Sequence, residues 1–396
     1  MIRLGVNLLD FKKHYRGGIN SFSLGLLKAL EEKKNILLNI YTNPASEIYL
    51  KKIFRKSNII SVKKSKLVFF VLQFFCIIFN KKKLFLSLEN SFYAKIKKRI
   101  EEESDVFYCP LSYLRPYNLN IPTVASIHDL QHLHYGNNFN FLQLKYRYFC
   151  YEETIKKSTI IQASSIFIKK DIIEFYPRIN KKKIEVINEG VSTDFKFKKV
   201  NIAKKKYIFF PAQLWEHKNH MTVLKSIKVL KEKYSINSKL VMVGEKFKSS
   251  KNILNFINNN KHLNIQYLGK VNFKKLISLY ENCKFLISPS LYESSSIPIL
   301  EACKIGRPVI CSDTDPNKEL GKKLKLNYFV SNSYENLANL IKKISKNNDL
   351  LKKQVNFNRN IIKYYNWDNI SEKYLKLFKK IKKRQIIIPI NNYSNA

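Results

Sequence analysis

Strand-like and helix-like segments alternate along this chain almost from end to end, and this pattern constrains its fold most. The first series starts with IRLGVNLL and the helix-like NSFSLGLLKALEEKK and continues through ILLNIYT, VFYC, TVASI and TIIQAS. A second series starts at YIFFPA and contains KLVMVG, IQYLG, FLISPS and PVICS. Short strands separated by helices of about ten or more residues indicate βαβ units and parallel sheets. The sequence therefore predicts an α/β protein with two doubly wound, Rossmann-like domains that face each other across a cleft.

A polar, lysine-rich stretch between the two series marks the expected domain boundary. We predict an N-terminal domain over residues 1–190, a linker over 191–206 and a second domain over 207–366. The last helical stretch has no strand after it, so residues 367–396 are expected to return to the first domain as a helix and a tail. A chain of 396 residues is long enough for two separate cores.

The net charge of +42 restricts the partners of this chain. Nucleic acid, an anionic membrane surface and compositional drift towards Lys, Ile and Asn each explain such a charge. The chain has 62 Lys and only 10 Arg, and the lysines are spread over its whole length. Because arginine is the preferred reader of bases and phosphates, nucleic acid is the least favoured partner.

The longest apolar run, LVFFVLQFFCIIF at residues 67–79, has lysines on both sides. Its 13 residues are too few to span a bilayer, which needs roughly 20. A core helix or strand is one interpretation, and an interfacial segment held on anionic headgroups is the other. We expect peripheral contact with the inner face of the cytoplasmic membrane.

The cysteines and the N-terminus indicate a cytoplasmic protein. The six cysteines form no CxxC pair and show no metal-ligand spacing, which is typical of buried, reduced thiols. IRLGVNLLD is interpreted as a first strand rather than a signal peptide.

The stretch SPSLYESSSIPILEACKIGRPVICSD, residues 288–313, carries most of the functional information. It follows an apolar strand, begins a helix at Pro298 and ends that helix at Gly306 before another strand. Glu293 is expected in the loop and Glu301 about one turn into the helix. In an open α/β sheet, ligands bind in the crevice at the carboxyl ends of the strands, and a helix N-terminus there favours phosphate. Carboxylates beside such a site suit the hydroxyls of a nucleotide sugar.

Two further segments follow strands of the predicted sheets. Lys218, in FFPAQLWEHKNH, is placed to neutralise a pyrophosphate, although the chain has many other lysines. His128, in TVASIHDLQHLHY, is placed to donate a hydrogen bond to a sugar or a developing charge. A metal site with Asp129 and His132, or a structural hydrogen bond, are the alternatives for His128.

Two short motifs are weaker. Gly17 and Gly18 follow the first strand and permit close approach to a phosphate or sugar, but a plain turn explains them equally well. The full GxGxxG spacing is absent, which disfavours nicotinamide and flavin cofactors. The tripeptide at residues 313–315, Asp-Thr-Asp, matches a loose cation-binding pattern but suits a helix cap or a turn better.

At these residues the chain resembles glycosyltransferase family 4, the retaining transferases with the GT-B fold. The resemblance runs over nearly the whole chain and includes IHDLQ, KIEVINEGV, AQLWEHKN and VMVGE. Its most specific part is the Glu293-x7-Glu301 pair followed by Gly-Arg-Pro-Val at residues 306–309.

The resemblance implies a role for each of five residues. Glu301 would bind the ribose hydroxyls, and Glu293 the donor sugar or the reacting centre. Lys218 would hold the diphosphate, Gly18 would line the acceptor-side loop, and His128 would contact the donor sugar near its anomeric carbon. No cofactor and no metal would be required.

The chain departs from the family pattern at two places. Ser294, Ser295, Ser296 and Ile297 stand where the family has glycine-rich residues, and serine hydroxyls are candidates to replace some phosphate contacts. Gln213 stands where the family often has arginine, which removes one positive charge from the diphosphate site.

These observations predict a retaining hexosyltransferase that moves a sugar from a nucleotide-diphosphate donor to a glycan or lipid-linked acceptor. Bacterial cell-surface polysaccharide biosynthesis, such as that of lipopolysaccharide, O-antigen or capsule, is the expected context. A non-catalytic nucleotide-sugar or nucleic-acid binding protein on the same scaffold is one alternative. A sugar-phosphate synthase or phosphorylase of the same fold is another.

Overall fold

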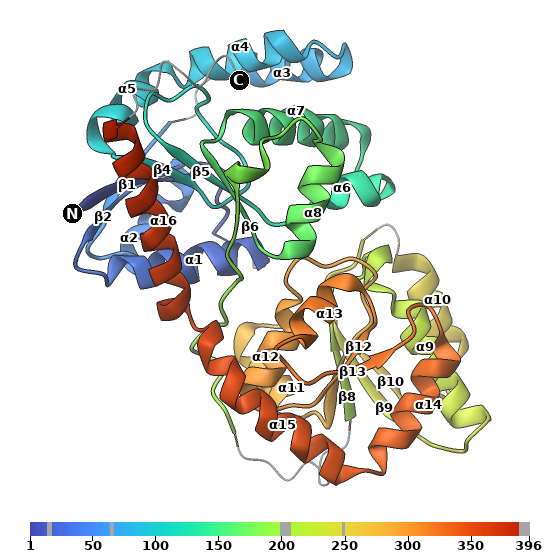
Figure 1. Ribbon diagram of the computed structural model, residues 1–396. Helices are drawn as coiled ribbons and strands as arrows, with labels where there is room; N and C mark the ends of the chain where they lie inside the picture. The colour runs from blue at the N-terminus through green and yellow to red at the C-terminus, as the bar shows by residue number, and fades with distance from the viewer. Residues whose placement is uncertain (14–17, 64–66, 199–206, 248–249, 388–396) are drawn as a thin grey trace. The chain divides into compact units, whose positions relative to one another are not determined.

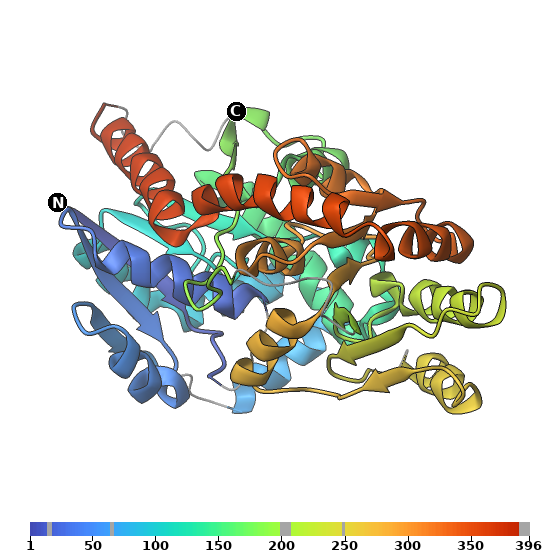
Figure 2. The same ribbon diagram turned by 90° about the horizontal axis from the view of Figure 1, so that it is seen from below.

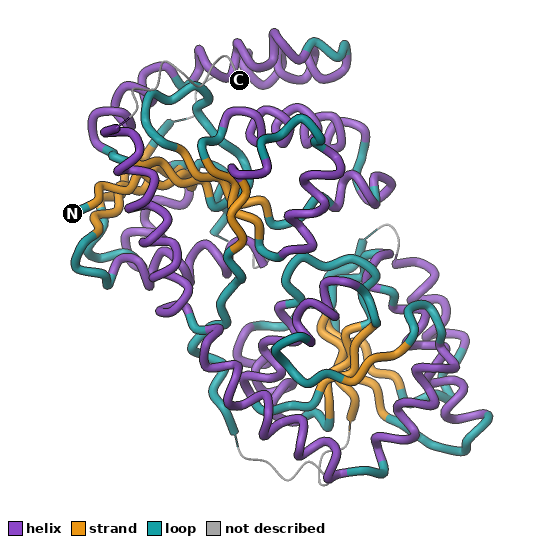
Figure 3. The backbone as a smooth tube through the Cα atoms, in the orientation of Figure 1, coloured by secondary structure: helices purple, strands orange, loops and turns teal. Residues whose placement is uncertain are grey.

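The chain forms two compact α/β units, each built on one parallel sheet with helices on both faces (Figures 1 and 3). Unit 1 comprises Met1–Gly190 with Trp367–Ala396, and unit 2 comprises Val191–Asn366. This confirms the predicted fold class of two doubly wound domains. The computed structural model describes residues 1–13, 18–63, 67–198, 207–247 and 250–387.

The sheet of unit 1 has seven strands in the order β3-β2-β1-β4-β5-β6-β7, and all neighbouring strands are parallel. The chain builds the sheet outward from β1 in one direction and then from β4 in the other. The strands are β1 (Ile2–Leu8), β2 (Ile36–Thr42), β3 (Asn58–Ser61), β4 (Val106–Cys109), β5 (Thr123–Ile127), β6 (Ile160–Ala163) and β7 (Ile184–Val186).

Successive side chains of the central strands point to opposite faces of this sheet, and both faces are buried in apolar clusters. Leu4, Val6 and Leu8 of β1 belong to one apolar cluster, whereas Phe107 and Cys109 of β4 belong to the cluster on the opposite face. The covering helices are α1 (Gly18–Glu31), α2 (Pro44–Ile53), α3 (Leu67–Ile78), α4 (Lys82–Phe92), α5 (Ala94–Glu103), α6 (Gln131–His134), α7 (Phe141–Lys157), α8 (Ile166–Phe175) and α16 (Trp367–Ile387).

The C-terminal helix α16 packs on unit 1, beside α1 (Figure 2). Trp367, at its start, lies where a side chain on Gly25 or Gly190 would collide with the indole ring. Phe22 contacts the same indole edge-to-face, with 5.6 Å between ring centroids. The glycines are therefore needed for close packing of this tryptophan, and residues 367–387 complete the core of unit 1. The tail expected after them falls at 388–396, outside the described residues.

Unit 2 has a parallel six-stranded sheet in the order β10-β9-β8-β11-β12-β13. Here the order reverses between β8 and β11, which lie side by side at the centre. The strands are β8 (Tyr207–Pro211), β9 (Lys239–Val243), β10 (Ile265–Tyr267), β11 (Phe285–Ser288), β12 (Val309–Ser312) and β13 (Asn327–Phe329).

Helices cover both faces of this sheet as well. Ile208 and Phe210 of β8 pack in one apolar cluster and Phe209 in the other, as the period of two requires. The helices are α9 (His220–Glu232), α10 (Ser250–Asn259), α11 (Phe273–Asn282), α12 (Ile297–Ile305), α13 (Asp315–Gly321), α14 (Tyr334–Ser345) and α15 (Asn348–Ile362).

The segment expected to be a linker, residues 191–206, is folded into unit 2 over its first part. Phe195 is buried and meets the rings of Phe273 and Tyr280 edge-to-face, each with 5.6 Å between centroids. The remainder, residues 199–206, lies outside the described residues.

The apolar run at residues 67–79 forms helix α3 (Leu67–Ile78), and its last residue, Phe79, follows the end of the helix. Cys76 and Ile77 are buried against Phe85 and Phe149, so one side of α3 packs on α4 and α7. The other side remains exposed, and we call it the exposed apolar face; its members are Val71, Leu72, Phe74, Phe75, Ile78 and Phe79. Among the helices described, none combines the length and hydropathy that crossing a membrane requires.

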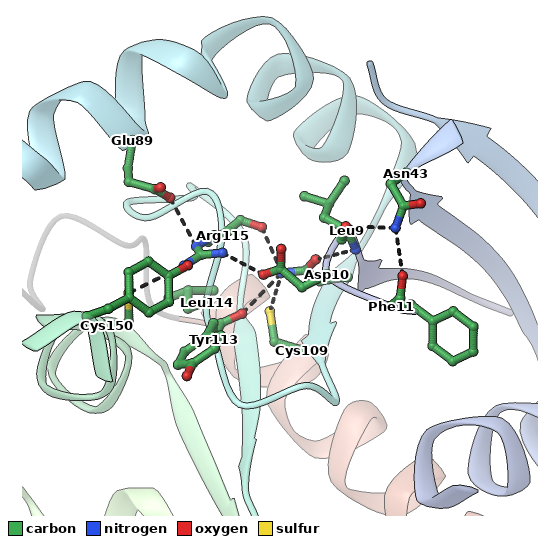
Figure 4. Close-up of polar contacts among 12 residues, drawn as sticks. Leu9, Asp10, Phe11, Asn43, Glu89, Cys109, Tyr113, Leu114, Arg115 and Cys150 are labelled. Carbon is green, nitrogen blue, oxygen red and sulfur yellow. Dashed lines mark hydrogen bonds and ion pairs between the residues drawn. The ribbon is translucent and has the colours of Figure 1, made fainter. Parts of the chain in front are cut away.

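A buried arginine fixes the carboxyl edge of unit 1 beside the β1–β4 pair (Figure 4). Arg115 donates to Asp10 at 2.5 Å, and its Nε lies 3.0 Å from Glu89 of α4. It also contacts the hydroxyl of Tyr146 and the thiol of Cys150. Burial disfavours the charged guanidinium, but Glu89, Tyr146 and Asp10 together outweigh this effect, and the pKa of Arg115 lies well above its usual value.

Replacing Arg115 by Met is expected to destabilise unit 1 by about 3–5 kcal/mol, because Glu89 would remain buried without a counter-charge. Urea unfolding followed by circular dichroism measures this change. Arg178→Met, at an exposed site, is the matched control and should change the free energy of unfolding by less than about 0.5 kcal/mol. An Arg115→Met protein as stable as this control would contradict the role given to the buried cluster.

Candidate functional site

The candidate site lies at the carboxyl edge of the sheet in unit 2, where strands β8 and β11 end next to each other. The loop after β8 and the loop after β11 are hydrogen-bonded together. The backbone N–H of Leu291 donates to the carbonyl of His217 at 2.8 Å, and the side chain of Asn219 donates to the carbonyl of Pro289 at 3.2 Å. Because strand order reverses between β8 and β11, this edge is the topological switch point at which α/β sheets bind ligands.

Lys218 and Glu293 form an ion pair at this edge. The Lys218 Nζ lies 2.6 Å from Glu293 Oε1, and the two side chains are 20% and 13% exposed. Lys218 ends the short 3-10 helix Glu216–Lys218, and Asn219 follows in the left-handed conformation with φ of 55°. This turn aims the ammonium group at the loop after β11. The two residues that sequence reasoning placed in one site are thus in direct contact.

The serine loop leads into helix α12. Ser296 precedes the helix with φ of 44°, a left-handed conformation that costs a non-glycine residue roughly 1–2 kcal/mol. Its hydroxyl donates to the buried Asn317 side chain at 2.7 Å, which offsets part of that cost. Ser296 therefore has a local role in the position where the resemblance leads one to expect glycine.

The other members of this loop differ in their surroundings. Ser295 is buried, and its hydroxyl has no hydrogen-bond partner among the described residues. Ser294 is half-buried, and Ile297 begins α12 and packs partly against the apolar core. Ser295 is thus the serine of this loop whose hydroxyl is buried without a partner among the described residues.

Glu301 lies on α12 and is half-buried. The hydroxyl of Tyr280 on α11 donates to its Oε2 at 2.6 Å. Burial raises the pKa of the Glu301 carboxyl to about 7, although the hydrogen bond from Tyr280 lowers it. The group therefore titrates near neutral pH.

Gln213 takes part in an aromatic arrangement at the same edge. Its Oε1 accepts a hydrogen bond from the indole of Trp215 at 2.8 Å. The Trp215 ring stacks on Phe247 with 3.8 Å between centroids and 23° between the planes. Gln213 thus orients Trp215 rather than adding charge to the site.

His128 and Gly18 lie in unit 1. Both ring nitrogens of the buried His128 are engaged, Nδ1 with Glu189 at 3.0 Å and Nε2 with the carbonyl of Pro110 at 2.8 Å. Burial disfavours the charged ring, but Glu189 outweighs this and raises the pKa of His128. A contact from His128 to a ligand therefore requires that one of these two partners be exchanged. Gly18 begins α1, and open space surrounds the position of a Cβ there.

The Asp-Thr-Asp tripeptide serves the turn before α13. Thr314 is the N-cap residue, and Asp315 lies in the first turn of the helix. Asp313 accepts hydrogen bonds from the backbone and hydroxyl of Ser331 at 2.9 and 2.7 Å. The structure thus places this motif at the turn into α13, although the Thr314 side chain makes no capping hydrogen bond to the helix.

Several residues of these arrangements were missed by sequence reasoning. Tyr280 contacts Glu301, Asn219 joins the two loops, Asn317 holds Ser296, and Glu189 holds His128. Asn219 carried the only local signal, because asparagine tolerates a left-handed turn at a helix start. The other contacts depend on packing between separate elements.

The family model described as "Glycosyl transferases group 1" matches residues 192–364. Two curated proteins are similar to parts of the chain. The O-antigen chain mannosyltransferase RfbU of Salmonella typhimurium is 27% identical over 189 residues, which is 48% of this chain and 51% of that protein. An N,N'-diacetylbacillosaminyl-diphospho-undecaprenol α-1,3-N-acetylgalactosaminyltransferase of Campylobacter jejuni is 25% identical over 57% of this chain and 55% of that protein. The chain spans about half the length of the curated relatives it matches.

Two solved structures resemble nearly the whole chain. Anabaena Alr3699/HepE in complex with UDP-glucose has a TM-score of 0.71 and 12% identity, over 96% of this chain and 100% of that one. WaaG, a glycosyltransferase involved in lipopolysaccharide biosynthesis, has a TM-score of 0.65 and 14% identity, over 95% and 99%. The chain therefore has the GT-B fold, and its residues 192–364 are similar to the glycosyl transferases of group 1.

Proposed function

We propose that this protein is a retaining hexosyltransferase whose donor, a nucleotide-diphosphate sugar, binds at the carboxyl edge of unit 2. The observation that carries this proposal is the meeting of Lys218 and Glu293 at the switch point, with Glu301 on the helix that follows. A cation for a diphosphate and carboxylates for hydroxyl groups are the groups that such a donor requires. The UDP-glucose complex of the similar Anabaena protein supports this class of ligand.

The donor diphosphate is proposed to take over the ammonium group of Lys218. In the structure Glu293 neutralises that group, so binding exchanges one anionic partner for another. The hydroxyl of Ser295 and the first turn of α12 are further donors for phosphate oxygens. Glu301 would accept hydrogen bonds from the ribose hydroxyls.

Glu293, once released from Lys218, is proposed to act at the sugar. Breaking the bond between the anomeric carbon and the diphosphate leaves positive charge on the sugar ring, which a carboxylate stabilises. Lys218 stabilises the negative charge on the leaving group. The acceptor oxygen then bonds to the anomeric carbon from the face that the diphosphate left, and the acceptor proton is released. We also propose that this chemistry needs no metal ion, because Lys218 supplies the positive charge.

The acceptor is proposed to be a lipid-linked glycan of bacterial surface polysaccharide synthesis, and unit 1 is proposed to approach the membrane. The names of both curated relatives support this acceptor, since one acts on O-antigen and the other on a diphospho-undecaprenol sugar. The exposed apolar face of α3 supports the contact with the membrane. Lys81 and Lys83 follow it closely and are exposed, as interfacial binding to anionic lipid requires.

Nucleotide binding tests the donor site. A nucleotide at 100 times its dissociation constant adds about 2.7 kcal/mol, which raises the melting temperature of a domain of this size by roughly 5–10 °C. We expect such a rise with UDP, GDP or ADP or with its hexose conjugate, without magnesium. Lys218→Ala should remove most of it, whereas the matched control Lys228→Ala, on an outer turn of α9, should keep it. Stabilisation by none of these ligands would contradict the donor site.

Transfer of labelled sugar to lipid extracts tests the chemistry. Glu293→Gln keeps the size of the side chain but removes its charge, so kcat should fall by at least about 100-fold. Binding of the nucleotide should persist in this variant because Lys218 remains. A variant with wild-type turnover would exclude Glu293 from the reaction, and binding without any turnover in the wild type would favour a binding protein.

Sedimentation with lipid vesicles tests the membrane contact. The wild type should bind more tightly to vesicles that contain phosphatidylglycerol than to vesicles of pure phosphatidylcholine. The triple change Phe74→Ser, Phe75→Ser and Phe79→Ser should weaken this binding at least about tenfold, because exposed apolar area is lost. Phe357→Ser, at an exposed phenylalanine of unit 2, is the control. Equal binding by the triple variant and this control would contradict a role for α3.

A further inference from the structure

We infer that Tyr280 is a positioning residue for Glu301, holding one carboxylate oxygen so that the other is presented to the ribose hydroxyls of the nucleotide. This inference rests on the proposed function. The contact that carries it is the 2.6 Å hydrogen bond from the Tyr280 hydroxyl to Glu301 Oε2. Glu301 comes from α12 and Tyr280 from α11, so the contact joins the carboxylate to a neighbouring element.

The ring of Tyr280 is fixed by the apolar core below the site. It is fully buried and meets Phe209 of β8 edge-to-face, with 5.0 Å between centroids and an angle of 82°. Phe195 meets it in the same way, at 5.6 Å and 89°. Because two aromatic neighbours fix the ring plane, the hydroxyl is held in place before any ligand binds. A carboxylate bound to such a hydroxyl loses little further freedom when it meets the ribose.

The same contact controls the charge of Glu301. Burial raises the pKa of this carboxyl, and the hydrogen bond from Tyr280 opposes that rise. Burial also raises the pKa of Tyr280 well above its usual value, so the phenol remains a proton donor. Within the described chain, the titratable groups found to act on this pair are its own two members and the buried Cys283. An ionised carboxylate accepts from hydroxyl groups more strongly than a protonated one.

The sign of the pH dependence follows. Nucleotide affinity is highest at a pH above the pKa of Glu301, where the carboxylate is ionised, and decreases as the pH falls through this pKa. Without the Tyr280 hydroxyl this pKa rises, so the decrease begins at a higher pH. A purely structural role of Tyr280 would change affinity or stability equally at every pH.

The chain supplies a matched control in Tyr207. Its hydroxyl donates to the backbone carbonyl of Leu279 at 2.7 Å, and its ring packs against the same apolar cluster. No hydrogen bond joins it to Glu301 among the interactions described for these residues. Tyr207→Phe therefore removes a partly buried hydroxyl on the same face of the sheet without altering the carboxylate.

The experiment is isothermal titration of UDP, GDP and ADP into the full-length protein from pH 6 to 9. For the nucleotide that binds best, Tyr280→Phe should weaken binding about tenfold at pH 7, the usual effect of losing a hydrogen bond to a charged group. The affinity should recover towards the wild-type value by pH 9, because Glu301 is ionised there in both proteins. Tyr207→Phe should reproduce the wild-type affinity and pH profile, and Glu301→Gln should retain only the step due to the nucleotide's own terminal phosphate, whose second pKa is about 6.

The outcomes separate this inference from the function on which it rests. If the wild type binds a nucleotide and Tyr280→Phe has the same affinity and pH profile, the positioning role is wrong and the donor site stands. A loss of affinity that is equal at pH 7 and pH 9 would also overturn it, since that indicates a structural role. If the wild type binds none of the three nucleotides, the donor site and the positioning role fall together. Should Tyr280→Phe unfold at low temperature, NMR of the Tyr280 hydroxyl proton in the folded wild type decides: a proton that exchanges with water as fast as that of an exposed tyrosine would show that the hydrogen bond to Glu301 is absent and would overturn the inference.

Discussion

The candidate site depends on one constraint of the parallel sheet in unit 2, namely that β8 and β11 are neighbours in the sheet. In the chain, 73 residues (212–284) lie between the end of β8 and the start of β11, and the described part of this stretch contains helices α9, α10 and α11 and strands β9 and β10. The helices that follow these strands, α9 and α12, pack on opposite faces of the sheet, which is the arrangement that creates a ligand site at the edge of α/β sheets. Hydrogen bonds between His217 and Leu291, and between Asn219 and Pro289, hold the two loops together at this edge. Lys218 and Glu293 are distant in the sequence, and they come into contact because β8 and β11 are adjacent in the sheet.

Three polar groups of the site are already paired within the protein. Lys218 neutralises Glu293, Tyr280 holds Glu301, and Asn317 holds Ser296. Half-buried charges are costly without such partners, so the pairs preserve the geometry in the absence of ligand. At Lys218 a diphosphate then replaces Glu293 as the anionic partner, and the net binding energy of this contact is the difference between the two ion pairs. This favours ligands with the same sign of charge as the protein group that they displace. A diphosphate, for example, is an anion like the carboxylate of Glu293.

The sequence was sufficient for the fold and for the position of the edge, since apolar strands followed by polar loops mark both. The strand and helix around Glu293 and Glu301 were predicted to within about one residue, at Phe285–Ser288 and Ile297–Ile305. Contacts between distant elements were not predictable. Tyr280 is one of 23 tyrosines, and Arg115 and Asp10 are 105 positions apart. The sequence of the run at residues 67–79 also did not show whether this segment is buried or exposed, because an apolar helix can have the same composition in a core and on a surface.

Unit 1 is discontinuous in the chain, and this has a consequence for its biosynthesis. Its core includes Trp367 and Tyr374 of α16, which are made only after the whole of unit 2. A ribosome adds about 5–20 residues per second, so Met1–Gly190 waits roughly ten seconds or more for the helix that covers α1. During that interval the apolar side of α1 is uncovered, and unit 2 is the first part of the chain that can complete its fold. Docking of α16 is therefore the closing step of folding, and a chaperone that shields α1 until then would have a defined site of action.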